Sequence, residues 1–306
     1  MTDATTSKPT PVLPYAGPLP RRHIDRRALA LKTAKRIASH ALLVIVSVVM
    51  MLPFAWMLIA SFKTLPDIDA DRLLSSSWHP ENYKQVFADP ELASRVNFGR
   101  YYFNSLFVAA WVTFLTCTTS AMAAFAFARL RWRGRDTVFL MYLATLMVPG
   151  IVTMIPNYAV MVRLHLLDSY AGLIVPTSFS AFGTFLLRQF MLTIPSSLDE
   201  AASIDGASKW RVFADVILPL TRPGLITLAI FAFLGNYGAL WWPLVMVKSQ
   251  YLRTLPIGMM YFDTTYGRQT NLIMAASVMA VVPPLVLFVI GQKFLVRGIQ
   301  LGAVKG

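Results

Sequence analysis

The sequence predicts an all-α, polytopic membrane protein with six transmembrane helices. Of its 306 residues, 56% are hydrophobic and only 14% are charged, whereas soluble domains carry about 25% charged residues. The apolar residues are clustered, and a helix needs about 20 of them to cross roughly 30 Å of hydrocarbon. Six segments approach or meet this length: 37–62, 103–128, 138–162, 171–187, 223–247 and 271–292.

The distribution of charge predicts how these six segments are oriented. None of them contains Asp, Glu, Lys or Arg except at its edges, as expected when a charge at the centre of a span costs about 2.5–3.5 kcal/mol. If the N-terminus lies inside, the inner segments carry 19 Lys and Arg against 7 Asp and Glu, and the outer ones carry 9 against 8. Inner loops are expected to be the basic ones. Both termini are therefore predicted to be cytoplasmic, and the net charge of +13 needs no nucleic-acid partner.

Residues 1–36 are predicted to form a disordered, basic cytoplasmic segment ahead of a membrane domain at 37–306. Five prolines stand among small polar residues in 1–20, a composition typical of disorder. Seven Lys and Arg residues follow in 21–36. They flank the first span, although a helix that binds lipid or a partner is an alternative. A signal peptide is not expected, because the apolar run is too long and no small-residue cleavage pattern follows it.

Metal binding and disulfide chemistry are not expected. Cys117 is the only cysteine, and the four histidines are scattered without ligand spacing. In the outer segment 63–102, Asp67, Asp69 and Asp71 alternate as metal ligands sometimes do. No glycine turn or distal glutamate completes a calcium loop, so these aspartates are expected to form a solvated surface.

Small residues and prolines in the spans allow two interpretations. Ser120, Ala124 and Ala128 recur every four residues, which lets two helices approach closely; the same residues could line a substrate path. Prolines interrupt most spans, and lipid tolerates this only where other helices or a water-filled cavity satisfy the freed backbone groups. A bundle around a path and a merely packed bundle remain equally open.

The loop 188–222 between the fourth and fifth spans is polar and well specified. Ser197 followed by Glu200 matches a capping box, which predicts a short helix over 198–205. Gly206 is placed to stop it, since glycine adopts the left-handed conformation readily. Ser208 can cap a second helix, whose expected apolar face consists of Phe213, Val216, Ile217 and Leu220. A two-turn helix is not stable alone in water, so we expect a partner to pack on this loop.

These residues carry a resemblance to a known family. The run Glu200-Ala201-Ala202-Ser203-Ile204-Asp205-Gly206, with Leu218-Pro219-Leu220 after it, resembles the EAA motif of ABC importer permeases. Tyr102-Phe103-Asn104-Ser105, Ala124–Arg129 and Leu301–Gly306 are similar to the carbohydrate-uptake branch, the maltose-type permeases that depend on a binding protein. The resemblance covers 37–306.

The resemblance implies a coupling helix that sits in a cleft of a cytoplasmic ATPase. Glu200 and Asp205 would offer charge contacts, Ala201 and Ala202 close packing, and Gly206 the turn. The implied partners are a second homologous permease, two ATPase subunits and an extracytoplasmic solute-binding protein, at the bacterial cell (inner) membrane. No phosphate-binding loop occurs in the sequence. ATP and Mg²⁺ would therefore be bound by the partners, and this chain is expected to be no enzyme and to hold no cofactor or metal.

The fifth span holds the candidates for substrate contact. The family often has a polar pair ahead of a Trp-Pro element, but Gly238 and Ala239 stand there in this chain. Asn236, Tyr237 and Trp241 are then the candidate path residues, or the partner permease supplies the contacts. The predicted cargo is a sugar or related polyol. A glycerol-phosphate or other small-solute ABC importer is the alternative. An ion-coupled carrier is less favoured, because that class needs ionisable residues inside the spans.

Overall fold

The computed structural model describes residues 26–70, 72, 77–88, 97–266 and 269–303. All regular structure in these ranges is helical, which confirms the predicted fold class. The chain divides into two compact units, 1–54 and 55–306. The predicted disorder of 1–20 lies outside the described residues. The helix α1 (Arg26–Ala60) already includes the end of the basic segment, so 26–36 continues directly into the first span.

Six spans are present when each bent pair of helices counts as one. The single helices are α1, α5 (Phe98–Ala128) and α16 (Thr270–Ala303). The three bent pairs are α6 (Arg135–Ala144) and η1 (Thr145–Met147) with α7 (Gly150–Arg163), α8 (Tyr170–Ile174) and η2 (Val175–Thr177) with α9 (Ala181–Thr193), and α11 (Lys209–Arg211) through α12 (Leu218–Leu220) with α13 (Arg222–Tyr237). They bend by 101°, 46° and 76°. The predicted span 223–247 is shorter than expected, since α13 ends at Tyr237 and a separate helix α14 (Trp241–Met246) follows.

The bends have local causes that differ from pair to pair. Pro149 stands between η1 and α7, where it can neither donate a backbone hydrogen bond nor continue the helix before it. The break before α9 falls at 178–180, just after a short helix that contains Pro176. Pro53 and Pro156 lie inside continuous helices. A proline alone therefore does not decide where a span breaks.

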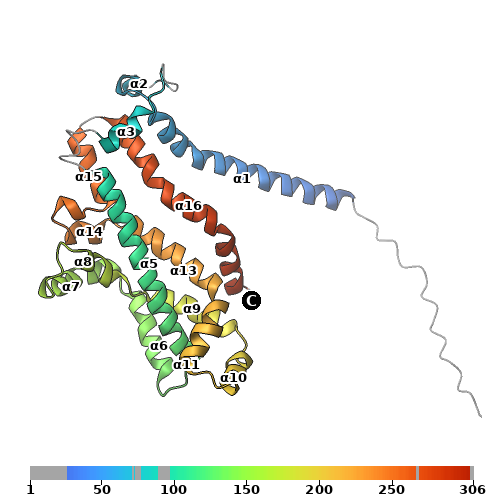
Figure 1. The fold of residues 1–306 in the computed structure, drawn as a ribbon. Helices are drawn as coiled ribbons and strands as arrows, with labels where there is room; N and C mark the ends of the chain where they lie inside the picture. Colours follow the sequence, from blue (N-terminus) through green and yellow to red (C-terminus); the bar gives the residue numbers. More distant parts are fainter. Residues whose placement is uncertain (1–25, 71, 73–76, 89–96, 267–268, 304–306) are drawn as a thin grey trace, which may run out of the picture. The chain divides into compact units, whose positions relative to one another are not determined.

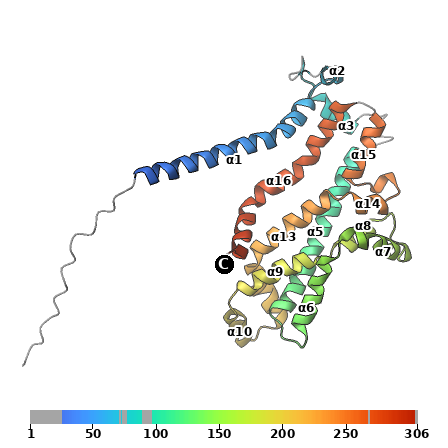
Figure 2. The same ribbon diagram turned by 180° about the vertical axis from the view of Figure 1, so that it is seen from behind.

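Helix α5 is the packing centre of the unit 55–306. It packs against α9 and α13, and α13 packs in turn against α16, as the two opposite views show (Figures 1 and 2). Ser120 and Ala124 of α5 are buried. A side chain at Gly183 of α9 would come within 2.6 Å of the Ser120 hydroxyl. The small residues of the second span therefore serve close helix packing.

Short helices form the end of this unit at which α5 begins, called here the outer end. They are α2 (Leu65–Asp69), α3 (Glu81–Ala88), η4 (Gln250–Leu252) and α15 (Leu255–Tyr266). The expectation that Asp67 is solvated was wrong. The residue is only 5% exposed. It lies in the first turn of α2, where its N–H is capped by the Thr64 side chain, and its carboxylate pairs with Arg72 at 3.5 Å. Asp69 is exposed as expected, and residue 71 is not described.

Candidate functional sites

The predicted coupling loop contains the helix α10 (Ser197–Ile204). It begins one residue earlier than expected, and the predicted capping box at Ser197 was wrong. The position before the helix is occupied by Ser196, whose side chain makes no cap. The N–H groups of Asp199 and Glu200 instead donate to the Ser196 carbonyl at 3.0 and 3.1 Å. These two acids still lie in the first turn, where negative charge is favoured by the helix dipole.

The end of α10 follows the prediction closely. Gly206 has φ of +80°, the left-handed conformation that ends many helices. The Ala207 N–H donates to the Ala202 carbonyl at 2.9 Å, and the Gly206 N–H donates to Ser203 at 3.1 Å. Ser208 then caps α11 by accepting the Arg211 N–H at 3.3 Å. Both the stop and the second cap are confirmed.

The second helix of the loop differs from an ideal α-helix. Between α11 and α12 it forms a single π-helical stretch, η3 (Val212–Ile217). A wider turn changes which side chains face the bundle. Phe213 and Ile217 are buried as predicted, Val212 joins them, and Leu220 is 50% exposed. The expected apolar face was therefore only partly right.

One face of α10 packs on the bundle and the other is open. Ala202 is half-buried against the cluster formed by Phe125, Leu187, Phe213 and their neighbours. Glu200, Ala201 and Asp205 are exposed. So are two large apolar side chains, Ile204 at 85% and Trp210 at 64%. The open side of α10 and the start of α11 thus expose both apolar side chains and negative charge.

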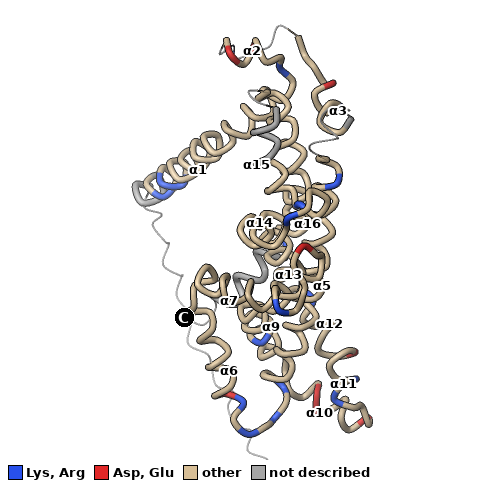
Figure 3. Tube along the Cα trace, turned by 90° about the vertical axis from the view of Figure 1, so that its left-hand side faces the viewer, with Lys and Arg blue, Asp and Glu red and all other residues tan. Residues whose placement is uncertain are grey.

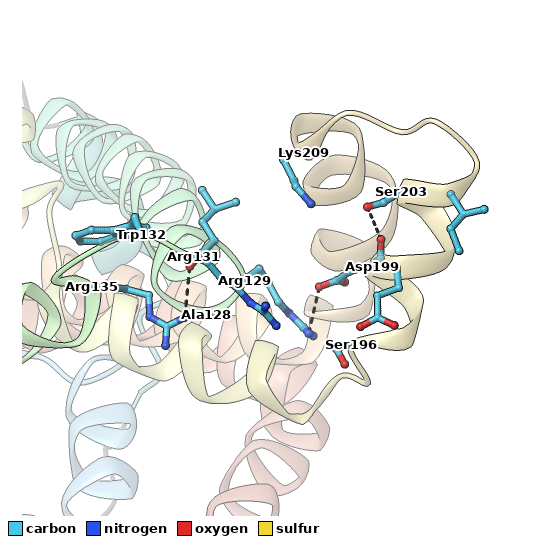
Figure 4. Close-up of a pocket in the computed structure, with 12 residues that line it drawn as sticks. Ala128, Arg129, Arg131, Trp132, Arg135, Ser196, Asp199, Ser203 and Lys209 are labelled. Atoms are coloured by element: carbon cyan, nitrogen blue, oxygen red, sulfur yellow. Dashed lines mark hydrogen bonds and ion pairs between the residues drawn. The ribbon is translucent and has the colours of Figure 1, made fainter.

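A buried arginine ties α10 to the rest of the protein. Arg129 ends α5 and is paired through Nη1 with Asp199 at 3.3 Å, with side chains 8% and 20% exposed. Its Nη2 donates to the carbonyls of Met191 and Ile194 at 2.6 and 2.7 Å. One guanidinium thus joins the ends of α5 and α9 to the first turn of α10 (Figure 4). Sequence reasoning missed this link.

A cavity of about 1220 Å³ opens between the loop 129–135 and α10. The end of the unit at which α5 finishes is called here the inner end, and basic and acidic residues gather there (Figure 3). Arg131, Lys209 and Glu200 line the cavity with Arg129 and Asp199. Among the described residues, neither Arg131 nor Lys209 has an ion-pair partner. Glu200 has no ion-pair partner among them either, so the cavity wall carries unpaired charges of both signs.

The three predicted path residues do not share one surface. Asn236 lines a pocket of about 210 Å³ between α5, α9 and α13. Tyr237 is only 6% exposed, and its hydroxyl donates to the Ala280 carbonyl at 3.0 Å within the core. Trp241 is 64% exposed on α14. Asn236 therefore lines a cavity, whereas Tyr237 lies in the core and Trp241 on the surface.

A second feature missed from the sequence lies at the outer end. Asp168, with φ of +52°, accepts hydrogen bonds at 3.0 Å from the N–H groups of Lys248 and Ser249 and from the Ser249 hydroxyl. Partial burial opposes ionisation, but these hydrogen bonds outweigh it and lower the pKa of Asp168. The carboxylate fastens the loop after α7 to the loop after α14.

Comparison with known proteins identifies the family. The model of the "binding-protein-dependent transport system inner membrane component" family matches residues 117–300, more than half of the chain. This chain belongs to that family. The permease is therefore a membrane component of an ABC importer, and the match includes α9, α10 and α13. Among the described residues, no cluster of His, Cys, Asp or Glu is arranged to hold a metal.

Similar permeases cover nearly the whole length of the chain. The arabinooligosaccharides transport system permease protein AraQ of Bacillus subtilis is 30% identical over 278 residues, which are 89% of this chain and 96% of that protein. The sn-glycerol-3-phosphate transport system permease protein UgpE of Agrobacterium fabrum is 34% identical over 281 residues, 90% and 98% of the two chains. A chain of a bacterial ABC transporter that imports alginate, solved by crystallography, has the same fold. It aligns with a TM-score of 0.75 at 21% identity, over 85% of this chain and 96% of that one.

Proposed function

We propose that this permease imports a sugar or related polyol, and that α10 is the helix through which a cytoplasmic ATPase subunit drives it. The observation that carries the proposal is the open face of α10. Glu200 and Asp205 place negative charge there, and Ile204 adds an apolar side chain that is 85% exposed. Acidic side chains on this face, in place of the Lys and Arg expected of a helix that lies on lipid, disfavour lipid as its cover. A protein cleft with a basic rim and an apolar floor suits it.

The link at Arg129 supports the same role. A movement imposed on α10 reaches Asp199 first, then Arg129, and through it the ends of α5 and α9. Packed elements joined by buried polar contacts move together more readily than they separate, because an unpaired buried charge is costly. ATP binding and hydrolysis in the partner would in this way tilt the spans that line the path.

The other subunits of the transporter are inferred from the family. The described chain offers the membrane path but no phosphate-binding loop. Two ATPase subunits inside, a second homologous permease in the membrane and a solute-binding protein outside complete the transporter. The excess of Lys and Arg in the inner segments supports cytoplasmic termini in a bacterial inner membrane.

The substrate class is supported by the relatives. AraQ is named for arabinooligosaccharides and UgpE for sn-glycerol 3-phosphate. A neutral sugar and a phosphorylated glycerol are thus the two leading candidates. The first candidate is uncharged and the second is anionic. The charge of the residues that line the path should therefore distinguish between them.

The coupling role is tested by removing the two kinds of contact on α10 separately. We expect Ile204→Ser and Glu200→Ala each to reduce co-purification of the ATPase subunit and ATP-dependent sugar uptake, while the permease still inserts into the membrane. Leu220→Ser is the matched control, because Leu220 is 50% exposed in the same loop but lies outside α10. Wild-type uptake and ATPase association in both α10 variants would contradict the proposal. A reporter fused after Val212 should read cytoplasmic, and an outer location would refute the orientation.

A further inference from the structure

The N-terminal part of α1 carries a charged surface that the import function does not use. The helix runs without a break from Arg26 to Ala60, so the basic start and the apolar span belong to one rigid rod. Figure 3 shows Lys and Arg gathered near the start of this helix. Residues 31–54, within the first compact unit, are all exposed. The direction of each side chain around the axis therefore follows from the turn of about 100° per residue.

Three cations and two other polar residues share one face of α1. Within an arc of about 140° lie Lys32, Lys35, Arg36, Ser39 and His40. The Ser39 hydroxyl donates to the Lys35 carbonyl at 2.9 Å. The His40 ring nitrogen Nδ1 lies 2.7 Å from the Arg36 carbonyl, which can only accept. Both polar groups are thus turned onto their own helix, and the three cations are left to bind a ligand.

No negative charge accompanies these cations on their helix. The sequence of α1 contains neither Asp nor Glu. Within the described residues, none of the three cations forms an ion pair. Like charges three or four positions apart, such as Lys32 with Lys35 and Arg36, repel one another and destabilise a helix. An anion bound on this face would relieve that repulsion, so the face is complementary to negative charge.

The length of α1 places the three cations at the level of lipid headgroups. Trp56, a residue of the type enriched at membrane interfaces, follows Arg36 by 20 positions. At about 1.5 Å per residue this separation is about 30 Å, which matches the hydrocarbon core of a bilayer. With Trp56 at one edge of the core, Arg36 lies at the other edge. Lys35 and Lys32 then lie up to about 6 Å beyond it, within the headgroup layer.

The opposite face of the same segment has a different character. Ala34, Ala38 and Ala41 lie there, at spacings of four and three residues. Small residues at such spacings let a second membrane helix approach closely. A protein neighbour is therefore expected on the alanine face. When that face meets protein, the cationic face points the other way, toward lipid.

We propose that Lys32, Lys35 and Arg36 form a binding site for the headgroup of an anionic phospholipid. The phosphate of such a lipid accepts charge-assisted hydrogen bonds from guanidinium and ammonium groups. Each basic residue near an anionic membrane surface strengthens binding by about fivefold. Phosphatidylcholine binds less tightly, because its own ammonium group offsets the phosphate charge. A bound anionic headgroup also fixes the rotation of α1 about its axis, with the alanine face turned away from it.

Lipid selectivity at this face is tested by fluorescence quenching in the complete transporter. Ser39→Cys in a Cys117→Ser background, with partner subunits that lack cysteine, places one bimane label among the cations. The vesicles are phosphatidylcholine with an equal small fraction of spin-labelled phosphatidylglycerol or spin-labelled phosphatidylcholine. At low salt we expect the anionic lipid to quench the label several-fold more strongly. In about 1 M NaCl, where the Debye length is about 3 Å, the two lipids should quench equally.

Charge removal provides the matched comparison. Lys32→Gln, Lys35→Gln and Arg36→Gln combined should abolish the preference for the anionic lipid. Arg26→Gln with Arg27→Gln should retain it, because the helical spacing places positions 26 and 27 outside the cationic arc. If the triple variant does not assemble, the salt dependence of the protein with its three cations intact decides the result.

Three outcomes would overturn the proposal. Equal quenching by both lipids at low salt would mean that the face is merely solvated. Quenching by neither lipid would mean that a protein covers it, and a preference that persists in the triple variant would place the lipid elsewhere. Both leaflets of the vesicles carry the same lipids, and the measurement needs neither ATP nor cargo. Its result is therefore independent of the proposed import function and of the predicted orientation.

Discussion

The two ends of the bundle are held together in different ways. At the inner end, one guanidinium carries the ion pair to Asp199 and two carbonyl contacts, beside a cavity of about 1220 Å³. At the outer end, Asp168 accepts three hydrogen bonds from the neighbouring loop. Asn104 bridges the Tyr251 and Arg253 carbonyls at 2.8 and 2.9 Å, and accepts from the Tyr170 hydroxyl at 2.6 Å.

This difference indicates at which end a partner's movement is passed to the membrane helices. Many short hydrogen bonds to backbone groups make the outer loops one fixed piece. At the inner end, Arg129 holds α10 while Arg188 of α9 donates to the Phe127 carbonyl and pairs with Asp136. The inner end also carries an exposed helix with apolar surface that a partner could cover. Changes at the inner end should therefore alter coupling, whereas changes at the outer end should alter stability first.

The largest effect is expected from Gly206→Val. Gly206 has φ of +80° and open space around it, so the strain comes from the backbone alone. The left-handed conformation costs an ordinary residue about 1–2 kcal/mol, and a β-branched one is worse. The end of α10 should shift, and ATP-dependent uptake should fall by more than about tenfold. Gly150→Val is the control, because Gly150 also has open space but no left-handed backbone. Normal uptake in the Gly206 variant would show that the turn does not matter.

The next effect concerns the inner link. Arg129→Gln leaves Asp199 and two carbonyls without their cation, and breaking a buried pair costs about 3–5 kcal/mol. We expect a lower melting temperature. We also expect ATP hydrolysis to continue while substrate uptake falls. Arg129→Lys should not restore coupling, since one ammonium cannot reproduce the forked contacts. Arg131→Gln, at an exposed position nearby, should behave as wild type. Uptake per ATP that stays normal in Arg129→Gln would contradict the role of the link.

A smaller effect is expected at the outer end, where it depends on pH. The hydrogen bonds that lower the pKa of Asp168 in the folded protein stabilise it fully above the unfolded pKa of about 3.9. This stabilisation is lost as the pH falls through the lower, folded pKa. The Asp168→Asn variant should therefore melt at a lower temperature than wild type at pH 7. The difference in melting temperature between the two proteins should shrink as the pH falls. A variant as stable as wild type at pH 7 would show that the carboxylate does not fasten the loops.

The smallest effect is expected from Arg100→Gln. The half-buried Arg100 guanidinium lies 3.6 Å from the centre of the Tyr251 ring and donates to the Tyr170 hydroxyl at 3.1 Å, contacts worth about 0.5–1.5 kcal/mol each. Thermal unfolding of the purified complex should detect a small loss of stability, with uptake per ATP unchanged. A change in uptake per ATP without a change in stability would contradict the claim that the outer end affects stability first.

The sequence predicted what depends on neighbours in the chain. The spans, the stop at Gly206 and the cap at Ser208 all follow from local composition and backbone preference. One missed feature is also local: the turn from Pro195 to Leu198 starts α10 one residue early, so Ser196 and not Ser197 precedes it. The other missed features depend on distant partners. The pairing of Arg129 with Asp199 joins residues 70 positions apart, and no spacing rule predicts it.

The path residues show the same limit. Asn236 and Tyr237 are neighbours in sequence, but a helix turns by about 100° per residue. One therefore faces a pocket and the other faces the core. The pocket itself needs the break at 178–180, which hydropathy does not register. Its walls come together only when α5, α9 and α13 pack against one another.

Photo-crosslinking in the assembled transporter tests the coupling role of α10 most directly. A photoreactive phenylalanine analogue at Ile204, on the open face of α10, is compared with one at Tyr251 of the outer end; the two native side chains are 85% and 62% exposed. We predict an adduct between position 204 and the ATPase subunit, and none from position 251. An assembled, active complex in which position 204 forms no adduct with the ATPase, or in which position 251 does, would contradict the account.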